Sequence, residues 1–112
     1  MPPIAPERGD FVWLEFDPQA GHEQAGRRPA LVVSPRSYNQ KLKLMVCCPV
    51  TSKRKGIPFE IVIPDGLPVS GVVLTQHMKS VDWRARNAQY ICAAPVQLLD
   101  EVVARLVQIL TE

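Results

Sequence analysis

The sequence has no run of apolar residues long enough to cross a membrane. Nowhere in its 112 residues do 18 consecutive apolar residues occur, and a membrane-spanning helix needs about 20. The first residues, MPPIAPERGD, also lack the basic start and apolar core of a secretory signal peptide. We therefore expect no membrane association and a location in the cytoplasm.

Residues that commonly hold metals or act as nucleophiles are scarce as well. The chain has three cysteines and two histidines, with no CxxC spacing and no HExxH motif. It also lacks a glycine-rich phosphate-binding loop and a Ser–His or Cys–His pair with a supporting signature. We expect no metal and no cofactor. Cys47, Cys48 and Cys92 are expected to be reduced core or boundary residues, the first two on opposite faces of a strand.

Negative charge is missing from the middle of the chain. Residues 27–55 contain eight lysines and arginines and no acid, whereas residues 1–26 contain five acids and one base. The net charge of +2 conceals this division. Clustered positive charge attracts polyanions such as nucleic acids. The other interpretation, a solvated surface without a partner, stays open for the run Lys53–Lys55.

The remaining composition is that of one globular domain. Apolar residues make up 46% of the chain and charged residues 21%, and a chain of this length supports a single core. We assign residues 1–112 to one domain, whose function must lie on loops or on an interface.

Short apolar runs separated by turn residues predict a mainly β fold. We expect strands at 9–16, 29–34, 44–50, 58–63, 71–76, 78–83 and 88–94. The eleven prolines are expected to separate the strands without entering the central ones. The expected architecture is a small barrel or strongly curled sheet.

The last segment, 95–112, has the periodicity of an amphipathic helix that covers the sheet. Five apolar residues share one face: Leu99, Val102, Val103, Leu106 and Leu110. Three more widen that face: Val96, Val107 and Ile109. Part of the helix therefore contacts either a partner subunit or the barrel of its own chain, and the sequence leaves both open.

Two polar residues mark the ends of two predicted strands. Arg28 begins one strand and Thr51 follows another, so antiparallel pairing of these strands would bring the two side chains together. A guanidinium fork and a hydroxyl together can hold a phosphate. The long segment 17–27 before Arg28 is the place where we expect further functional residues.

Such a pair suits the cleavage of RNA by its own ribose 2′-hydroxyl. Arg28 would stabilise the negative charge that develops on the phosphoryl oxygens, but arginine is a poor general base. Glu23 is the better candidate for the base and His22 the weaker one, since a lone histidine is more often an ordinary loop residue.

A second group lies in QHMKSVDWRAR, residues 76–86. It places Gln76, Lys79, Arg84 and Arg86 around Trp83. Cations beside an aromatic ring suit single-stranded RNA. The alternative is that Trp83 belongs to the core or to an interface.

Several motifs occur together in a specific order. They are GDFVW, GHEQAGRRP, PVTS and QHMKSVDW, at residues 9–13, 21–29, 49–52 and 76–83. In this combination the chain resembles the MazF/PemK-type toxins of bacterial toxin–antitoxin pairs over nearly its whole length. The resemblance implies a small SH3-like β-barrel with a C-terminal α-helix, mainly β or α+β by some schemes, and a homodimer.

The resemblance also implies an activity. Members are endoribonucleases that cut single-stranded mRNA at a short sequence without metal and leave 2′,3′-cyclic phosphate and 5′-hydroxyl ends. By position, Arg28 and Thr51 match the catalytic arginine and threonine of the family, and Glu23, Gln24 and Gln76 match residues associated with the RNA site. We expect Arg28, Thr51 and Glu23 to be the catalytic residues. We expect RNA to contact Phe16, Asp17, His22, Gln24, Arg27, Ser52, Lys53, Gln76, Lys79, Arg84 and Arg86.

The same resemblance implies partners. A cognate, MazE-like antitoxin would cover the RNA site with an acidic tail, and the toxin–antitoxin complex would bind its own promoter DNA. His22 stands where serine is common in the family, and Arg27 stands where histidine or a variable residue is found.

Two alternatives use the same fold. One is a toxin that poisons DNA gyrase, but such proteins end in an aromatic-glycine-isoleucine tail and this chain ends QILTE. The other is a noncatalytic module that binds nucleic acid or protein. The presence of Arg28, Thr51 and Glu23 favours the enzyme.

Overall fold

A computed structural model describes residues 4–16 and 26–112 of the chain. The strands within these residues are β1 (Asp10–Phe16), β2 (Gly26–Val32), β3 (Met45–Thr51), β4 (Glu60–Val62), β5 (Val72–Leu74), β6 (Lys79–Val81) and β7 (Gln89–Ala93). The helices are α1 (Arg36–Leu42), the short 3-10 turn η1 (Thr75–His77) and α2 (Val96–Thr111). In this part of the chain, no helix is both long and apolar enough to span a membrane.

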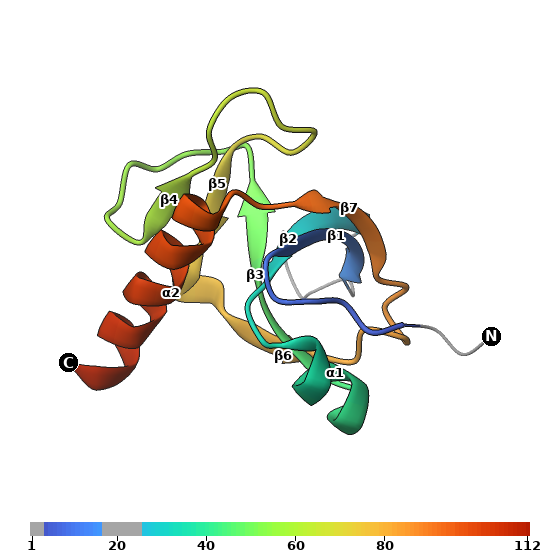
Figure 1. The fold of residues 1–112 in the computed structure, drawn as a ribbon. Coiled ribbons are helices and arrows are strands. Elements are labelled where there is room, and N and C mark those ends of the chain that lie inside the picture. Colours follow the sequence, from blue (N-terminus) through green and yellow to red (C-terminus); the bar gives the residue numbers. More distant parts are fainter. Residues whose placement is uncertain (1–3, 17–25) are drawn as a thin grey trace.

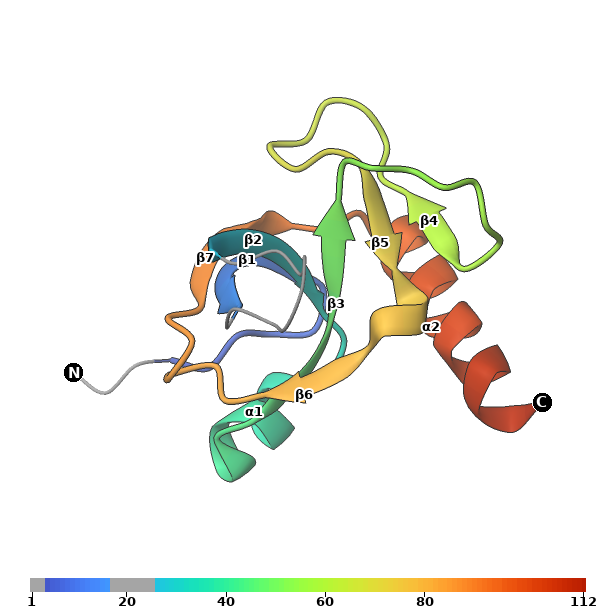
Figure 2. The same ribbon diagram turned by 180° about the vertical axis from the view of Figure 1, so that it is seen from behind.

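The strands form one strongly curled antiparallel sheet (Figures 1 and 2). Its order is β4-β5-β3-β2-β1-β7, and β6 also pairs with β3. The start of β3 pairs with β6 and its end pairs with β5, while the chain forms η1 between them. The expected class, a mainly β, barrel-like fold with a C-terminal helix, is confirmed, although the sheet is not closed in the described residues.

The central strands are buried on both faces. On one face, Phe11, Leu31 and Cys48 pack in a core with Val102 and Leu106 of α2. This burial explains why β1, β2 and β3 are rich in apolar residues on both sides of each strand.

The opposite face has a core of its own, which includes Val12, Val32, Cys47 and Trp83. Cys47 and Cys48 therefore lie on opposite faces of β3, as the sequence predicts. Trp83 is only 3% exposed, so the interpretation of this residue as part of the core is confirmed.

A short helix, α1, was not expected from the sequence. It has only seven residues, too few to establish a helical period. Fully buried Asn39 holds it in place. Its side-chain Nδ2 donates to the carbonyls of Pro6 and Ser34, and its backbone carbonyl accepts from Trp83 Nε1.

Several strands are shorter than expected. The strand expected at 71–76 ends at Leu74, where η1 begins, and the strand expected at 78–83 ends at Val81. Asp82 ends it by accepting hydrogen bonds at Oδ1 from the N–H groups of Arg84 and Ala85, which forms a turn.

The expectation that proline would stay out of the central strands is wrong. Pro29 lies within β2 and Pro49 within β3. Proline lacks the N–H that a sheet needs. The pairing of β2 with β3 ends at Ala30–Pro49, although both strands continue beyond it.

The predicted apolar face of α2 differs from the face that the structure buries. Leu98, Val102 and Leu106 are its buried residues, whereas Leu110 is 67% exposed. The widening residues, Val96, Val107 and Ile109, are exposed too. Their exposure argues against burial on the barrel of their own chain, and contact with a partner subunit stays a prediction.

The buried thiols give a first testable expectation. Burial raises the pKa of both Cys47 and Cys48 to about 12, so neither forms the reactive thiolate near about pH 8. Ellman's reagent should therefore label at most one thiol of the folded chain, the half-buried Cys92, and three after denaturation.

The variant Cys92→Ser is the control for this experiment, since it should react only when unfolded. Rapid reaction of two or more thiols in the folded wild type would contradict the two-sided core.

Candidate active site

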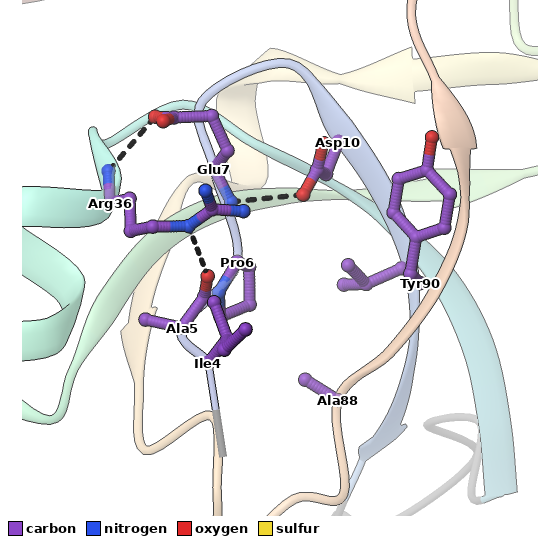
Figure 3. A pocket seen from close by; sticks show the side chains of 9 residues that line it. Ile4, Ala5, Pro6, Glu7, Asp10, Arg36, Ala88 and Tyr90 are labelled. Carbon is purple, nitrogen blue, oxygen red and sulfur yellow. Dashed lines mark hydrogen bonds between the residues drawn. The ribbon is translucent and has the colours of Figure 1, made fainter. Parts of the chain in front are cut away.

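A cavity of about 500 Å³ lies between the N-terminal segment, α1 and β7 (Figure 3). The polar groups around it already bind one another. Glu7 Oε1 accepts from the Arg36 N–H, Arg36 Nε donates to the Ala5 carbonyl, and Asp10 Oδ2 accepts from the Glu7 N–H. Backbone N–H groups of Arg36 and then Arg8 lower the pKa of Glu7. Satisfied groups of this kind stabilise the fold, so the size of this cavity does not make it the active site.

A second cavity, of about 300 Å³, lies where β2 and β3 separate. It is lined by Arg28 and Thr51, the two residues that the sequence places at strand ends. Their positions follow from the register, since Arg28 and Thr51 each lie two residues beyond the last pair, Ala30–Pro49, on the two strands. The antiparallel pairing that the sequence analysis required is therefore present.

The Thr51 hydroxyl is oriented by the backbone that follows it. The N–H of Lys53 donates to Thr51 Oγ1 over 3.1 Å, in the manner of an ST-turn. Because Oγ1 accepts this bond, the hydroxyl hydrogen remains available to donate to a ligand.

The backbone of Arg28 is fixed in the sheet, and its guanidinium binds no other described residue. Its backbone lies opposite Leu14 of β1, which is fully buried. Among the described residues, no hydrogen-bond or ion-pair partner holds the Arg28 guanidinium. Its planar set of donors is free to bind two oxygens of one anion.

Sequence reasoning did not predict six of the residues that line this cavity: Trp13, Pro29, Val50, Pro68, Val69 and Ser70. Trp13 is 40% exposed at its wall, and Pro68 and Ser70 come from the loop between β4 and β5. This loop rises beside the end of β3 (Figure 2). It is distant in sequence from both Arg28 and Thr51, and no motif links the two regions.

Gly71 brings that loop close to Thr51. Its φ of +110° is unfavourable for other residues, and a Cβ at this position would lie 2.2 Å from the Thr51 carbonyl oxygen. The absence of a side chain therefore allows β5 to start directly against the backbone of Thr51.

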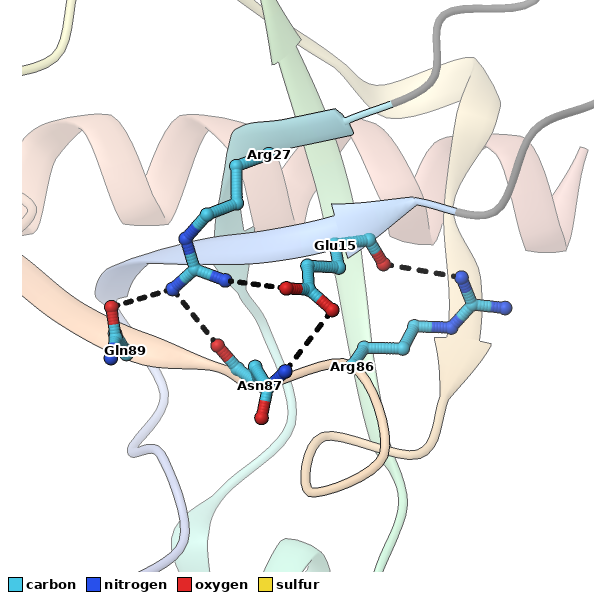
Figure 4. Close-up of polar contacts among 5 residues, drawn as sticks. All are labelled: Glu15, Arg27, Arg86, Asn87 and Gln89. Atoms are coloured by element: carbon cyan, nitrogen blue, oxygen red, sulfur yellow. Dashed lines mark hydrogen bonds and ion pairs between the residues drawn. The ribbon is translucent and has the colours of Figure 1, made fainter.

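Arg27 points into a polar network rather than standing free (Figure 4). Its Nη2 donates to the Asn87 carbonyl over 3.0 Å and to Gln89 Oε1 over 2.6 Å, and its Nη1 lies 3.6 Å from Glu15 Oε1. Arg86 Nη1 also donates to the Glu15 carbonyl. Arg27 thus joins the starts of β2 and β7, and RNA binding by this residue remains a prediction.

The structure places four other expected RNA contacts: Lys79, Phe16, Gln76 and Arg84. Lys79 Nζ sits 4.9 Å from the centre of the Phe16 ring, so these two residues are brought together. Gln76 is exposed on η1 and does not line the cavity. Arg84 is exposed in the turn that follows Asp82.

The loop after Thr51 carries exposed positive charge. Ser52, Lys53 and its two basic neighbours are exposed, and Ser52 lines the cavity. Glu60 shapes the loop, because its carboxylate accepts from the N–H groups of Lys55 and Gly56.

Four expected site residues lie outside the described residues: Asp17, His22, Glu23 and Gln24. Within the described ranges 4–16 and 26–112, no cluster of histidine, cysteine and acidic side chains could hold a metal ion.

Comparison with known proteins gives a consistent result. Residues 7–110 match the family described as PemK-like, MazF-like toxin of type II toxin-antitoxin system. The Endoribonuclease toxin MazF of Escherichia coli (strain K12) is 49% identical over 83 residues, 74% of each chain. Endoribonuclease PemK of Escherichia coli is 36% identical over 109 residues, 94% of this chain and 82% of the relative.

Solved structures agree. MazF (Form-I) from Deinococcus radiodurans is 54% identical with a TM-score of 0.88, and the match covers 96% of this chain and 98% of that one. The MazE–MazF (Form-II) structure from the same organism is 55% identical with a TM-score of 0.87, and covers 95% and 96%.

The close approach at Gly71 predicts an asymmetry between two glycines. Gly66 also has a positive φ, of +96°, but nothing lies within 4 Å of its missing Cβ. Gly66→Ala should cost about 1–2 kcal/mol for backbone strain. Gly71→Ala should cost about 1–3 kcal/mol more, because the new methyl group overlaps Thr51.

Urea denaturation of the two variants and the wild type measures this difference. Equal losses of stability in both variants would contradict a packing role for Gly71.

Proposed function

This chain belongs to the PemK-like, MazF-like toxins of type II toxin–antitoxin systems and is an endoribonuclease toxin, and we propose that it cuts single-stranded mRNA at a short sequence without metal. The observation that supports this most directly is the cavity that Arg28 and Thr51 line together. A guanidinium that no other described residue binds, beside an oriented hydroxyl, matches the geometry of a phosphate ligand.

The proposed reaction is an internal transfer of the phosphoryl group. The ribose 2′-oxygen forms a bond to phosphorus while the bond from phosphorus to the 5′-oxygen breaks. The 2′-hydroxyl proton goes to a base, and the leaving 5′-oxygen takes up a proton. The products are a 2′,3′-cyclic phosphate and a 5′-hydroxyl, so atoms balance without added water or metal.

Arg28 and Thr51 serve the phosphoryl oxygens in this proposal. The guanidinium binds two of them as negative charge grows, and the Thr51 hydroxyl donates to the same group. A preorganised donor of this kind contributes about 10²–10³ in rate. Lys53 contributes through its backbone, since its N–H orients Thr51 Oγ1.

We assign the general base to Glu23 and keep His22 as the weaker candidate. A carboxylate or imidazole can accept the 2′-hydroxyl proton, whereas arginine stays charged. Both residues lie outside the described residues, so this assignment rests on the sequence alone.

We propose that RNA follows the positive surface around the cavity. Phosphates would meet Lys53, Arg84 and Arg86, while the Lys79–Phe16 pair offers a cation and a ring to a base. The other proposed contacts are Asp17, His22, Gln24, Arg27, Ser52 and Gln76.

We also propose a cognate antitoxin whose acidic tail covers this surface. Solved relatives include MazE–MazF structures, and eight positive charges between residues 27 and 55 suit an acidic peptide. The resulting complex would bind promoter DNA. The toxin would work in the cytoplasm, where its mRNA substrate lies.

We propose that two copies of the chain form a homodimer. Val107, Ile109 and Leu110 of α2 are exposed at 53%, 39% and 67%. Apolar side chains grouped on one helix end are typical of a surface that a partner covers.

The first experiment is incubation of the purified protein with a long, defined RNA in the presence of EDTA. We expect cuts at a recurring short sequence with 5′-hydroxyl ends, and loss of about 10²–10³ in rate for Arg28→Ala. No cleavage by folded wild type, or full cleavage by Arg28→Ala, would contradict the proposal.

Arg28→Lys tests the geometry of the guanidinium. Lysine keeps the charge but cannot place two donors on one phosphate, so this variant should be nearly as slow as Arg28→Ala. The measurement is the single-turnover rate with saturating enzyme. A lysine variant close to wild type would show that charge alone is sufficient.

Lys53→Ala tests the path of the RNA. It should weaken binding to RNAs of any sequence and reduce the slope of log K against log salt by up to about 0.7, the value for one contact to a single strand. Lys41→Ala, on α1 away from the cavity, is the matched control and should leave the slope unchanged. An unchanged slope for Lys53→Ala would remove Lys53 from the RNA path.

A further inference from the structure

The cavity that Arg28 and Thr51 line exists because two neighbouring strands separate. Beyond the pair Ala30–Pro49, β2 stays paired with β1 as far as Phe16–Gly26. The end of β3 instead pairs with β5, at Val50–Val73 and Thr51–Val72. Each strand is held by its outer neighbour, and the cavity occupies the fork between them.

The hydrogen-bond pattern explains where the fork begins. The Val33 N–H donates to the Val46 carbonyl over 2.9 Å, while the Val46 N–H donates to Ser34 Oγ, so Val33 and Val46 occupy a hydrogen-bonding position of the ladder with one of its two bonds made. Bonded and non-bonded pairs alternate along an antiparallel ladder. Leu31–Cys48 is therefore the next bonded pair, and Pro29–Val50 the one after it.

Pro29 cannot complete that pair. Its nitrogen carries no hydrogen, so the Val50 carbonyl receives no donor from β2. On the other side of β2 the same alternation puts Pro29 opposite Trp13 in a non-bonded pair, because Val12–Ala30 and Leu14–Arg28 are the bonded ones. This is why the pairing with β1 continues through Pro29 without interruption.

Pro49 lacks an N–H on the other side of β3. Its nitrogen faces away from β2, toward the side where β3 pairs with β6 and β5. Pairing on that side stops after Cys47–Lys79 and resumes at Val50–Val73, with η1 in between. The two prolines thus open β3 on opposite sides, and only Pro29 opens it toward the cavity.

We propose that the missing N–H of Pro29 sets the distance between Arg28 and Thr51 and so makes Pro29 a positioning residue for the cleavage reaction. This inference rests on the proposed function of that pair. An N–H at residue 29 would bind the Val50 carbonyl, extend the ladder by one bond and draw the two strands together where the phosphate must enter.

The test compares two replacements of Pro29 that differ in one group. Pro29→Ala supplies the N–H, whereas lactic acid at position 29, introduced by nonsense suppression, has the same methyl group and an ester oxygen in place of the N–H. Both lose the proline ring, so the comparison removes the donor and otherwise only weakens the Arg28 carbonyl as an acceptor toward β1.

We expect Pro29→Ala to fold with a thermal midpoint equal to or above that of the lactic acid variant. Its single-turnover cleavage rate should fall by about 10- to 100-fold, as for a displacement of about 1 Å in an active site. The lactic acid variant should cleave at a rate close to wild type. In Pro29→Ala, the new amide should exchange slowly with deuterium, because it is bonded to Val50.

Pro49→Ala is the matched control, since it adds an N–H to β3 on the side that faces away from β2 and from the cavity. It should keep its single-turnover rate.

Three results would overturn the inference: equal loss of rate in the alanine and lactic acid variants, rapid exchange of the residue 29 amide, or an equal loss of rate in Pro49→Ala. Failure of the proposed function looks different, because then wild type would not cleave RNA or Arg28→Ala would. The exchange measurement does not depend on activity.

Discussion

The unbroken pairing of β2 with β1 is the constraint on which the rest of the structure depends. Six residue pairs, from Phe11–Leu31 to Phe16–Gly26, keep one register. Because β1 holds β2 along its whole length, β3 can leave β2 without any loss of order in the strand that carries Arg28. The opening of the sheet is therefore local, and it occurs at the cavity that Arg28 and Thr51 line.

Burial on both faces gives this opening its rigidity. Ala30, which is 0% exposed, lies beside the residues that line the cavity, and Val50, which is 3% exposed, is one of them. Polar groups in the middle of such strands would be cut off from solvent, so strand ends are the places where a guanidinium and a hydroxyl can meet a ligand while their backbones stay fixed. The polar network of Arg27 and Glu15 fastens the same end of β2 and β1 from the side.

Sequence reasoning placed Arg28 beside Thr51 because strand ends and antiparallel neighbours follow from local patterns. It missed α1, whose seven residues show no period, and it missed Trp13, Pro68 and Ser70 as cavity walls, since their meeting depends on tertiary packing. It also predicted that proline stays out of central strands, because proline is rare there on average, whereas Pro29 and Pro49 lie within β2 and β3. Which side of a strand a proline nitrogen faces depends on the register, and the register is not visible in one sequence.

The side chain of Asn39 ties together parts of the chain that the sheet alone would leave independent. Its Nδ2 donates to Pro6 in the N-terminal segment and to Ser34 before α1, while the backbone carbonyl of the same residue accepts from Trp83 Nε1 beyond β6. Loss of the Pro6 or the Ser34 carbonyl leaves an N–H of this fully buried amide without its acceptor, which is costly. The three segments therefore share one local unfolding equilibrium, and native-state hydrogen exchange would see them open as a single cooperative unit at the end of the sheet away from the cavity of Arg28 and Thr51.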